Sequence, residues 1–320
     1  MDSEIEKIFL DYFKLLVETY TVAPCATRPL LENIAEKLKE AGNIQVRILP
    51  AVGSGHGILL ARVGPIKDEG GLMLSGHVDV VSANDQKWKR YIRPYHLTQR
   101  GQRFYGRGTT DMKAFDALAL TLLHVWSRSR DELTEPLYVI LTPDEETGMR
   151  GARQAIRHME QYGPRPHLIV VGEPSNGKVI YKHKGSLRLT FELTGKSAHA
   201  SDPGKGINVI FPGAHIITFT ERLKQEMGEG PGAPEFEVAH DTFSPGIFQA
   251  GNTANTVPEE GRIVISIRFS NDAQAQSIIE QYQTMCRELE RQYGAEDSYQ
   301  QFKIYQQLKI EVSSRIIPVF

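Results

Sequence analysis

Cysteine is scarce in this chain of 320 residues. Cys25 and Cys286 stand far apart, and neither belongs to a Cys-x-x-Cys or Cys-His cluster. This usage excludes a cysteine-based metal motif and fits a reducing compartment. Long apolar runs are also absent, since no stretch approaches the ~18 apolar residues of a membrane span, and the N-terminus is acidic where a secretory signal would be basic. A cytoplasmic location with no membrane partner is therefore expected.

An excess of charge of either sign is missing as well. Lys and Arg number 37 against 39 Asp and Glu, which gives a formal net charge of -2 and an isoelectric point near 6.6. A basic field suited to nucleic acid is therefore excluded, and the expected partners are small molecules. The composition is that of an ordinary globular protein, 40% hydrophobic and 24% charged, and a chain of this length is expected to form two domains.

Three short apolar runs each lead directly into metal-type ligands. The runs and their ligands are residues 71–76 with His77, residues 137–142 with Glu145 and Glu146, and residues 168–172 with Glu173. Apolar runs of this length, separated by helical stretches, are typical of buried strands in a largely parallel sheet. Because the active crevice of an open α/β sheet lies outside the carboxyl ends of its strands, these ligands are expected to meet there.

The hydrophobic pattern changes to strict alternation in residues 187–193 and 263–267. Alternation with a period of two is typical of half-exposed antiparallel strands. The sequence therefore predicts an α/β protein with two domains. The first has a mainly parallel sheet with flanking helices and comprises residues 1–182 and 294–320. The second is an inserted α+β domain with an antiparallel sheet, residues 183–293.

Four segments that carry the candidate ligands occur in a characteristic order. They are Ser-Gly-His77-Val-Asp79, Gly-Arg-Gly-Thr-Thr-Asp111-Met-Lys, Pro-Asp-Glu145-Glu146-Thr-Gly and Gly-Glu173-Pro-Ser. Each residue alone has an ordinary explanation as a surface or loop residue, but the joint occurrence does not. Along almost the whole chain the sequence resembles the zinc-dependent metallohydrolases that include acetylornithine deacetylase, succinyl-diaminopimelate desuccinylase and aminoacylase. Acetylornithine deacetylase is the member that it most resembles, and a zinc exopeptidase-like fold is implied.

Hydrolysis of an amide at neutral pH needs a nucleophilic hydroxide and stabilisation of an oxyanion, and Zn²⁺ supplies both. The resemblance implies that His77, Asp111 and Glu173 hold one Zn²⁺, or Co²⁺ in its place. It also implies that Asp111 bridges to a second ion bound by Glu146, and that Glu145 is the general base and not a ligand.

Asp79 follows His77 by two residues. At this spacing its carboxylate could accept a hydrogen bond from the second ring nitrogen of His77 and fix the tautomer of that ring. An exposed loop aspartate is the alternative.

The second domain supplies three further candidates. Similarity to the family suggests that His199, from a partner subunit, stabilises the oxyanion in a homodimer formed through this domain. Asn255 and Arg268 resemble residues that bind the carboxylate or carbonyl of the substrate, and a guanidinium suits a carboxylate. An outward-facing strand arginine is an almost equal alternative for Arg268, and a polar loop histidine for His199.

The sequence departs from the family pattern at two places. The family's last ligand is a histidine near the C-terminus, whereas the ten histidines here end at His240. We therefore expect a C-terminal segment to be lacking, with one ion bound well and a second bound weakly or not at all. Asp116 stands where the family usually has an apolar residue. Because burying an unpaired carboxylate is unfavourable, Asp116 is expected to be either paired or exposed.

The expected reaction is hydrolysis of an N-acyl amino acid. N-acetylornithine, giving ornithine and acetate in arginine biosynthesis, is the substrate that the resemblance implies. Two alternatives stay open, a truncated relative that binds metal with weak or no turnover, and a di- or tripeptidase of the same family.

Overall fold

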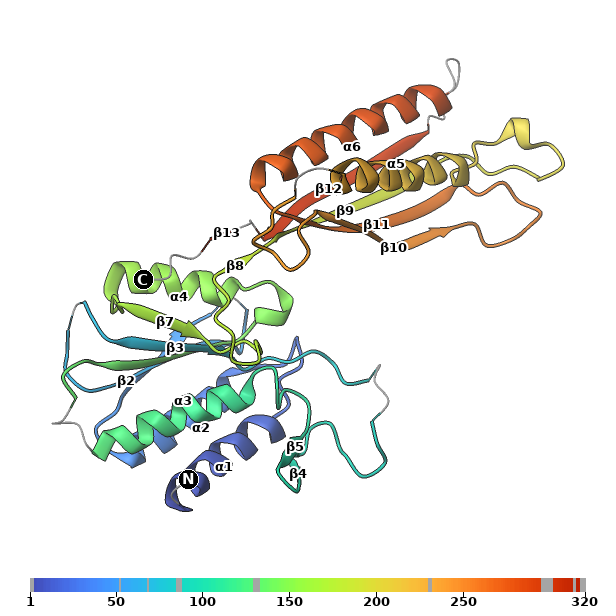
Figure 1. Cartoon of the computed structure of the whole chain (residues 1–320). Coiled ribbons are helices and arrows are strands. Elements are labelled where there is room, and N and C mark those ends of the chain that lie inside the picture. Colours follow the sequence, from blue (N-terminus) through green and yellow to red (C-terminus); the bar gives the residue numbers. More distant parts are fainter. Residues whose placement is uncertain are drawn as a thin grey trace. The chain divides into compact units, whose positions relative to one another are not determined.

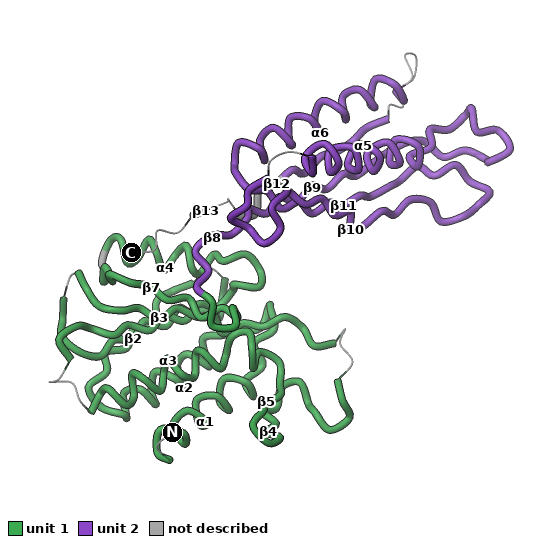
Figure 2. Tube along the Cα trace, in the orientation of Figure 1, with its two compact units in different colours: residues 1–178 green, residues 179–320 purple. Residues whose placement is uncertain are grey.

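The computed structural model describes residues 3–51, 53–67, 69–84, 88–128, 133–229, 232–294, 302–312 and 315–316. The chain divides into two compact units, residues 1–178 and residues 179–320 (Figure 2). The first boundary therefore lies four residues before the one expected from the sequence. No helix among the described residues is long and apolar enough to cross a membrane.

Unit 1 is built on a five-stranded mixed sheet of order β1-β2-β6-β3-β7 (Figure 1). Its strands are β1 (Gln45–Pro50), β2 (Gly57–Val63), β3 (Leu72–His77), β6 (Leu137–Thr142) and β7 (Leu168–Val171). β3 runs parallel to both β6 and β7, whereas β1, β2 and β6 are joined by antiparallel pairing. The three runs expected to precede ligands are confirmed as the three parallel strands.

Helices cover both faces of this sheet. α1 (Ser3–Glu18), α2 (Arg28–Ala41) and α3 (Lys113–Trp126) share one apolar core with the strands, and α4 (Arg150–Tyr162) packs on the opposite face (Figure 1). Alternate residues of β3 and β6 enter the two cores, as Leu74 and Met73 do. The remaining elements of unit 1 are β4 (Thr98–Arg100), β5 (Arg103–Tyr105) and the short 3-10 helix η2 (Glu145–Thr147).

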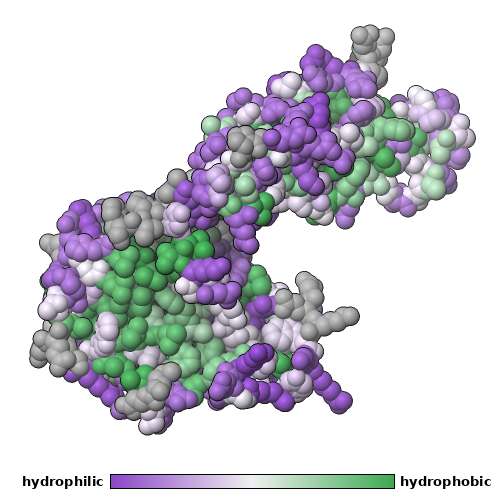
Figure 3. Space-filling model, viewed as in Figure 1, coloured by the Kyte–Doolittle hydropathy of each residue, from purple (hydrophilic) through white to green (hydrophobic). Residues whose placement is uncertain are grey.

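The outer strand of this sheet, β7, is exposed along its whole length. Its four residues are 38–56% exposed, and within the described part of the chain it pairs only with β3. Figure 3 shows hydrophobic side chains gathered over this side of unit 1. Leu118 and Leu122 on α3 and Ile156 on α4 are further exposed apolar residues of the same unit.

Unit 2 contains a four-stranded antiparallel sheet of order β10-β11-β9-β12. Its strands are β9 (Gly185–Thr194), β10 (Thr242–Ala250), β11 (Glu260–Phe269) and β12 (Lys303–Val312). The helices α5 (Ile210–Gly228) and α6 (Asp272–Tyr293) pack with the inward residues of the strands into one core. β8 (Lys182–His183) pairs with β13 (Arg315–Ile316), and η3 (Pro203–Lys205) is a short 3-10 helix.

The last part of the chain differs from the sequence-based expectation. Residues 294–320 were expected to return to the first domain, but β12 pairs with β9 over nearly its whole length, within unit 2. The alternation in residues 303–310 supplies apolar residues such as Ile304 to the core of unit 2. Residues 317–320 lie outside the described residues.

Candidate active site

The candidate site of unit 1 is centred on His77, the last residue of β3. Its side chain is only 2% exposed. The ring nitrogen Nε2 lies 3.3 Å from Asp111 Oδ1 and 3.8 Å from Glu173 Oε1. Asp111 precedes α3 by two residues and Glu173 follows β7 by two residues. The ends of the parallel strands β3 and β7 therefore bring His77 and Glu173 together, as predicted, and the segment before α3 places Asp111 beside them.

Asp79 connects this histidine to the Glu145–Thr147 turn. The Nδ1 atom of His77 lies 3.0 Å from the backbone oxygen of Asp79 and 3.4 Å from its Oδ1. The two carboxylate oxygens of Asp79 accept hydrogen bonds, each of 3.0 Å, from the backbone N–H groups of Glu145 and Glu146. Asp79 is thus buried and not an exposed loop residue, and it fixes the turn that carries both glutamates.

Two overlapping sets of donor atoms converge around His77. His77, Glu145 and Glu173 offer atoms within 4.8 Å of one another, and so do His77, Asp111 and Glu146. The grouping differs from the one that the family resemblance implied, in which Asp111 and Glu173 share an ion with His77. All five predicted residues nevertheless belong to one cluster.

The electrostatics of the cluster favour a bound cation. Burial raises the pKa of Glu145 to about 6, and the neighbouring carboxylates Glu173, Glu146 and Asp79 add to this effect. Burial also raises the pKa values of Glu146 and Glu173. Burial lowers the pKa of His77, but the hydrogen bond and charge of Asp79, with further negative charges, outweigh it and raise the pKa to about 10.

The donor set fits a divalent metal ion. One imidazole and four carboxylates, gathered in two groups that share His77, are donor types that suit Zn²⁺, and carboxylates that repel one another gain stability when a cation lies among them. His77, Asp111, Glu146 and Glu173 are the residues that would hold it.

Two buried residues lie beside the cluster. The sequence analysis gave Lys113 no role, and it expected a different environment for Asp116. Burial lowers the pKa of Lys113 to about 8, and its ammonium group donates three hydrogen bonds. Asp116, expected to be paired or exposed, is fully buried, and neither of its oxygens has a hydrogen-bond partner among the described residues. Burial raises its pKa well above the ordinary value. The carboxylate fits because residue 76 is a glycine. A Cβ at Gly76 would lie 1.8 Å from Asp116 Oδ1.

The three candidates of the second domain lie in unit 2, and the structure brings only two of them together. The segment around His199 pairs with the segment around Asn255, because Ala200 donates its N–H to the backbone oxygen of Asn255 at 3.0 Å. His199 is exposed, and its Nδ1 lies 2.7 Å from Ser201 Oγ. Arg268 is exposed near the other end of β11, so it is remote from both.

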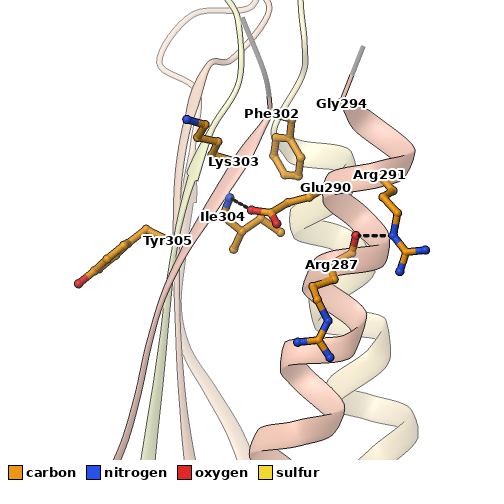
Figure 4. Close-up of a pocket in the computed structure, with 8 residues that line it drawn as sticks. All are labelled: Arg287, Glu290, Arg291, Gly294, Phe302, Lys303, Ile304 and Tyr305. Atoms are coloured by element: carbon orange, nitrogen blue, oxygen red, sulfur yellow. Dashed lines mark hydrogen bonds between the residues drawn. The ribbon is translucent and has the colours of Figure 1, made fainter. Parts of the chain in front are cut away.

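Unit 2 contains two hollows of its own. One, of about 630 Å³, is lined by Lys196–His199, Asp202 and Gly204–Ile207. The other, of about 660 Å³, lies between α6 and the start of β12 (Figure 4). Its one carboxylate, Glu290, accepts a hydrogen bond from the backbone N–H of Ile304 at 2.8 Å. The Glu290 carboxylate thus joins α6 to β12. The residues that line this second hollow do not form a donor set for a metal ion.

Residues 73–310 match the family model described as Peptidase family M20/M25/M40. The chain belongs to this family. The match begins at β3 and includes the whole acidic cluster as well as His199, Asn255 and Arg268.

Individual M20 relatives agree with this assignment. Acetylornithine deacetylase of Pasteurella multocida is 33% identical over 256 residues, which are 78% of this chain and 64% of that protein. This chain therefore spans a little less than two thirds of its length. The structure of a tripeptidase from Staphylococcus aureus gives a TM-score of 0.69 at 18% identity, covering 98% of this chain and 78% of that one. A dinuclear metal-binding M20 peptidase from Bacillus subtilis gives 0.64 at 16% identity, with 98% and 76% coverage.

Proposed function

We propose that this M20 chain is a metal-dependent amidohydrolase that removes the acyl group of an N-acyl amino acid. N-acetylornithine is the proposed substrate, and ornithine and acetate are the products. The observation that carries the proposal is the convergence of the buried His77 with Glu145, Glu146 and Glu173 at the ends of three parallel strands, together with Asp111 from the segment before α3. The 33% identity to an acetylornithine deacetylase supports the choice of substrate.

His77, Asp111 and Glu173 are proposed to hold one Zn²⁺ tightly, with Co²⁺ able to take its place. Asp111 and Glu146 alone would hold a second ion weakly, because zinc sites normally draw at least three ligands from protein. A divalent ion in this position supplies polarisation of the scissile carbonyl and acidification of water.

Glu145 is proposed as the general base and acid. Its carboxylate would take a proton from the attacking water and then deliver this proton to the leaving amine, and its burial, which raises its pKa, suits that exchange. Asp79 positions the Glu145 backbone through its hydrogen bond, which favours a fixed orientation of the base. Glu146, one residue later, is held in the same way.

Unit 2 is proposed to complete the substrate site. An imidazole such as that of His199, contributed by a partner subunit in a homodimer, would donate a hydrogen bond to the oxyanion. Asn255 would bind the substrate beside it, since the two backbone segments are paired. Arg268 would bind a substrate carboxylate as a separate contact, because it lies near the opposite end of β11.

The test of this function is the Glu145→Gln variant, with metal content and deacetylation of N-acetylornithine measured together. We expect the rate to fall by roughly 100- to 10,000-fold, as for loss of a general base, while the bound metal remains. Glu36→Gln, at an exposed position on α2, is the matched control and should keep full activity. Undiminished activity of Glu145→Gln would exclude Glu145 as the base.

A peptidase function is the second candidate, favoured by the tripeptidase whose fold covers 98% of this chain. The two functions are separated by assaying the metal-loaded protein on N-acetyl amino acids and on di- and tripeptides. The proposed function requires the higher kcat/KM on the acyl amino acids. No hydrolysis of either class would leave the chain as a metal-binding relative without turnover.

A further inference from the structure

Lys113 lies between the chain segments that carry His77 and Asp111. It is the first residue of α3, two positions after Asp111, and its side chain is completely buried. The ammonium group donates to the backbone oxygens of Leu16 at 2.7 Å and Thr19 at 3.3 Å. Its third hydrogen bond, of 2.9 Å, goes to the hydroxyl of Thr21. All three donors of the ammonium are therefore used.

Thr21 continues this connection to the loop after β3. Its hydroxyl donates to the backbone oxygen of Val78 at 2.6 Å, and its backbone oxygen accepts from the N–H of Val80 at 3.3 Å. Val78 and Val80 flank Asp79, and Val78 directly follows His77. Thr21 is itself fully buried, so these bonds are shielded from water.

The turn that carries Asp111 is fixed at the same point. The backbone N–H of Lys113 donates to Gly108 O at 2.9 Å, which closes the turn around Asp111. The Lys113 side chain lies against Gly108, since a Cβ at that glycine would stand 3.0 Å from Lys113 Cδ. One side chain thus joins the Asp111 turn through Thr21 to the residues next to His77.

We propose that Lys113 and Thr21 are positioning residues for the metal site, setting the separation of the His77 and Asp111 donor atoms. This inference rests on the proposed function, because it needs a divalent ion at those donors. The competing interpretation is that Lys113 only satisfies the last carbonyl groups of α1, a helix without a basic residue in its final turn. Thr21 separates the two interpretations, because removing its hydroxyl leaves the bonds to Leu16 and Thr19 in place.

The experiment compares Thr21→Val, Thr21→Ser and Lys113→Met with the unaltered chain. Co²⁺ affinity is measured by competition with a chromophoric chelator, and the visible spectrum of bound Co²⁺ reports its coordination geometry. We expect Thr21→Val and Lys113→Met to weaken affinity by about 10- to 100-fold and to change the spectrum, as loss of groups that orient metal ligands does. Thr21→Ser keeps the hydroxyl and should retain both properties.

Leu123→Ala is the control for a general loss of stability, because Leu123 is buried in the same helix but belongs to the apolar core. It should lower the melting temperature without changing Co²⁺ affinity or spectrum. The positioning role is overturned if Thr21→Val binds Co²⁺ as the unaltered chain does, or if Leu123→Ala weakens binding equally. Absence of Co²⁺ binding by the unaltered chain would instead overturn the proposed function, and this inference with it.

Discussion

β3 and β7 are neighbouring parallel strands that each lead into a candidate metal ligand, yet their surroundings differ. β3 is paired on both sides, and His77 at its end is 2% exposed. β7 is paired with β3 alone among the described strands, all four of its residues are exposed, and the side chain of Glu173 is 45% exposed. The two ligands lie 3.8 Å apart despite these different environments.

The comparison indicates that the two sides of the site differ in rigidity. On the His77 side, hydrogen bonds between buried or part-buried groups hold the segments next to the histidine. Asp79 holds the turn at Glu145, and the Lys113–Thr21 connection holds the loop at Val78. On the β7 side, backbone pairing with β3 supplies the position of Glu173. Local stability is highest where many buried contacts meet, so the histidine side is expected to be the more ordered one.

The largest expected difference concerns the apolar pair Leu74 and Val170, which are register partners in β3 and β7. Leu74→Ala removes a buried core side chain and should lower the free energy of unfolding by about 3 kcal/mol. Val170→Ala should change it by less than about 0.5 kcal/mol, as exposed substitutions do. Both tryptophans, Trp88 and Trp126, lie in unit 1, so fluorescence-monitored urea unfolding reports on this unit. Equal losses would show that β7 is covered in solution.

Loss of His77 should weaken metal binding more than loss of Glu173 does. His77 belongs to both sets of donor atoms, whereas Glu173 belongs to one. His77→Ala is expected to weaken Co²⁺ binding more than Glu173→Ala, and both losses should exceed the roughly 10- to 100-fold effect of losing an orienting group. Calorimetric titration with Co²⁺ measures both, and a larger loss for Glu173→Ala would reverse the comparison.

Two glycines that precede the ligands provide a third contrast. A Cβ at Gly76 would lie 1.8 Å from Asp116 Oδ1, and one at Gly172 would lie 2.0 Å from the ring of Phe115. Asp116 is fully buried, whereas Phe115 is only half-buried, at the margin of the core. Overpacking at Gly76→Ala should therefore lower stability by about 2 kcal/mol and Gly172→Ala by about 1 kcal/mol. Thermal unfolding of the two variants, followed by tryptophan fluorescence, tests this order.

The smallest effect concerns pH and Asp116. Because burial raises the pKa of Asp116 in the folded protein, the folded state binds more protons than the unfolded state above the ordinary pKa of an aspartate. The contribution of this residue to stability therefore falls as pH rises from that value toward the folded pKa. Asp116→Asn removes this dependence and should gain about 1 kcal/mol over the metal-free parent at pH 8, with a smaller gain at pH 5. A gain independent of pH would contradict the assignment.

Much of unit 1 could be predicted because its signals are local. The apolar runs before His77, Glu145 and Glu173 identify strands, and the carboxyl ends of parallel strands converge. The helices expected to flank this sheet are confirmed, among them α1 and α2. The Asp79 carboxylate was expected to accept a hydrogen bond from the His77 ring, but the atom 3.0 Å from Nδ1 is the backbone oxygen of Asp79, and its Oδ1 lies 3.4 Å away. The bonds of that carboxylate to the Glu145 and Glu146 N–H groups depend on tertiary structure and could not be foreseen.

Other features could not be predicted because they depend on partners distant in the sequence. The alternation in residues 303–310 indicates a half-exposed strand but not which sheet it joins, so β12 was assigned to the wrong unit. Lys113 follows Asp111 closely, but its contacts with Thr21 and α1 bridge more than 90 residues. The burial of Asp116 likewise depends on Gly76, 40 positions earlier.

The position of β3 in the sheet has a consequence for synthesis of the protein. β3 lies between β6 and β7, although it precedes both in the chain. Glu173 is made 96 residues after His77, which takes about 5 to 20 s at roughly 5 to 20 residues per second. β6 is completed within that interval and β7 only at its end, so the nascent β3 first lacks both neighbours and then lacks β7 alone. Once Glu173 has emerged, unit 1 is a continuous segment with every acidic donor of the cluster, so the donor set is complete while unit 2 is still being translated.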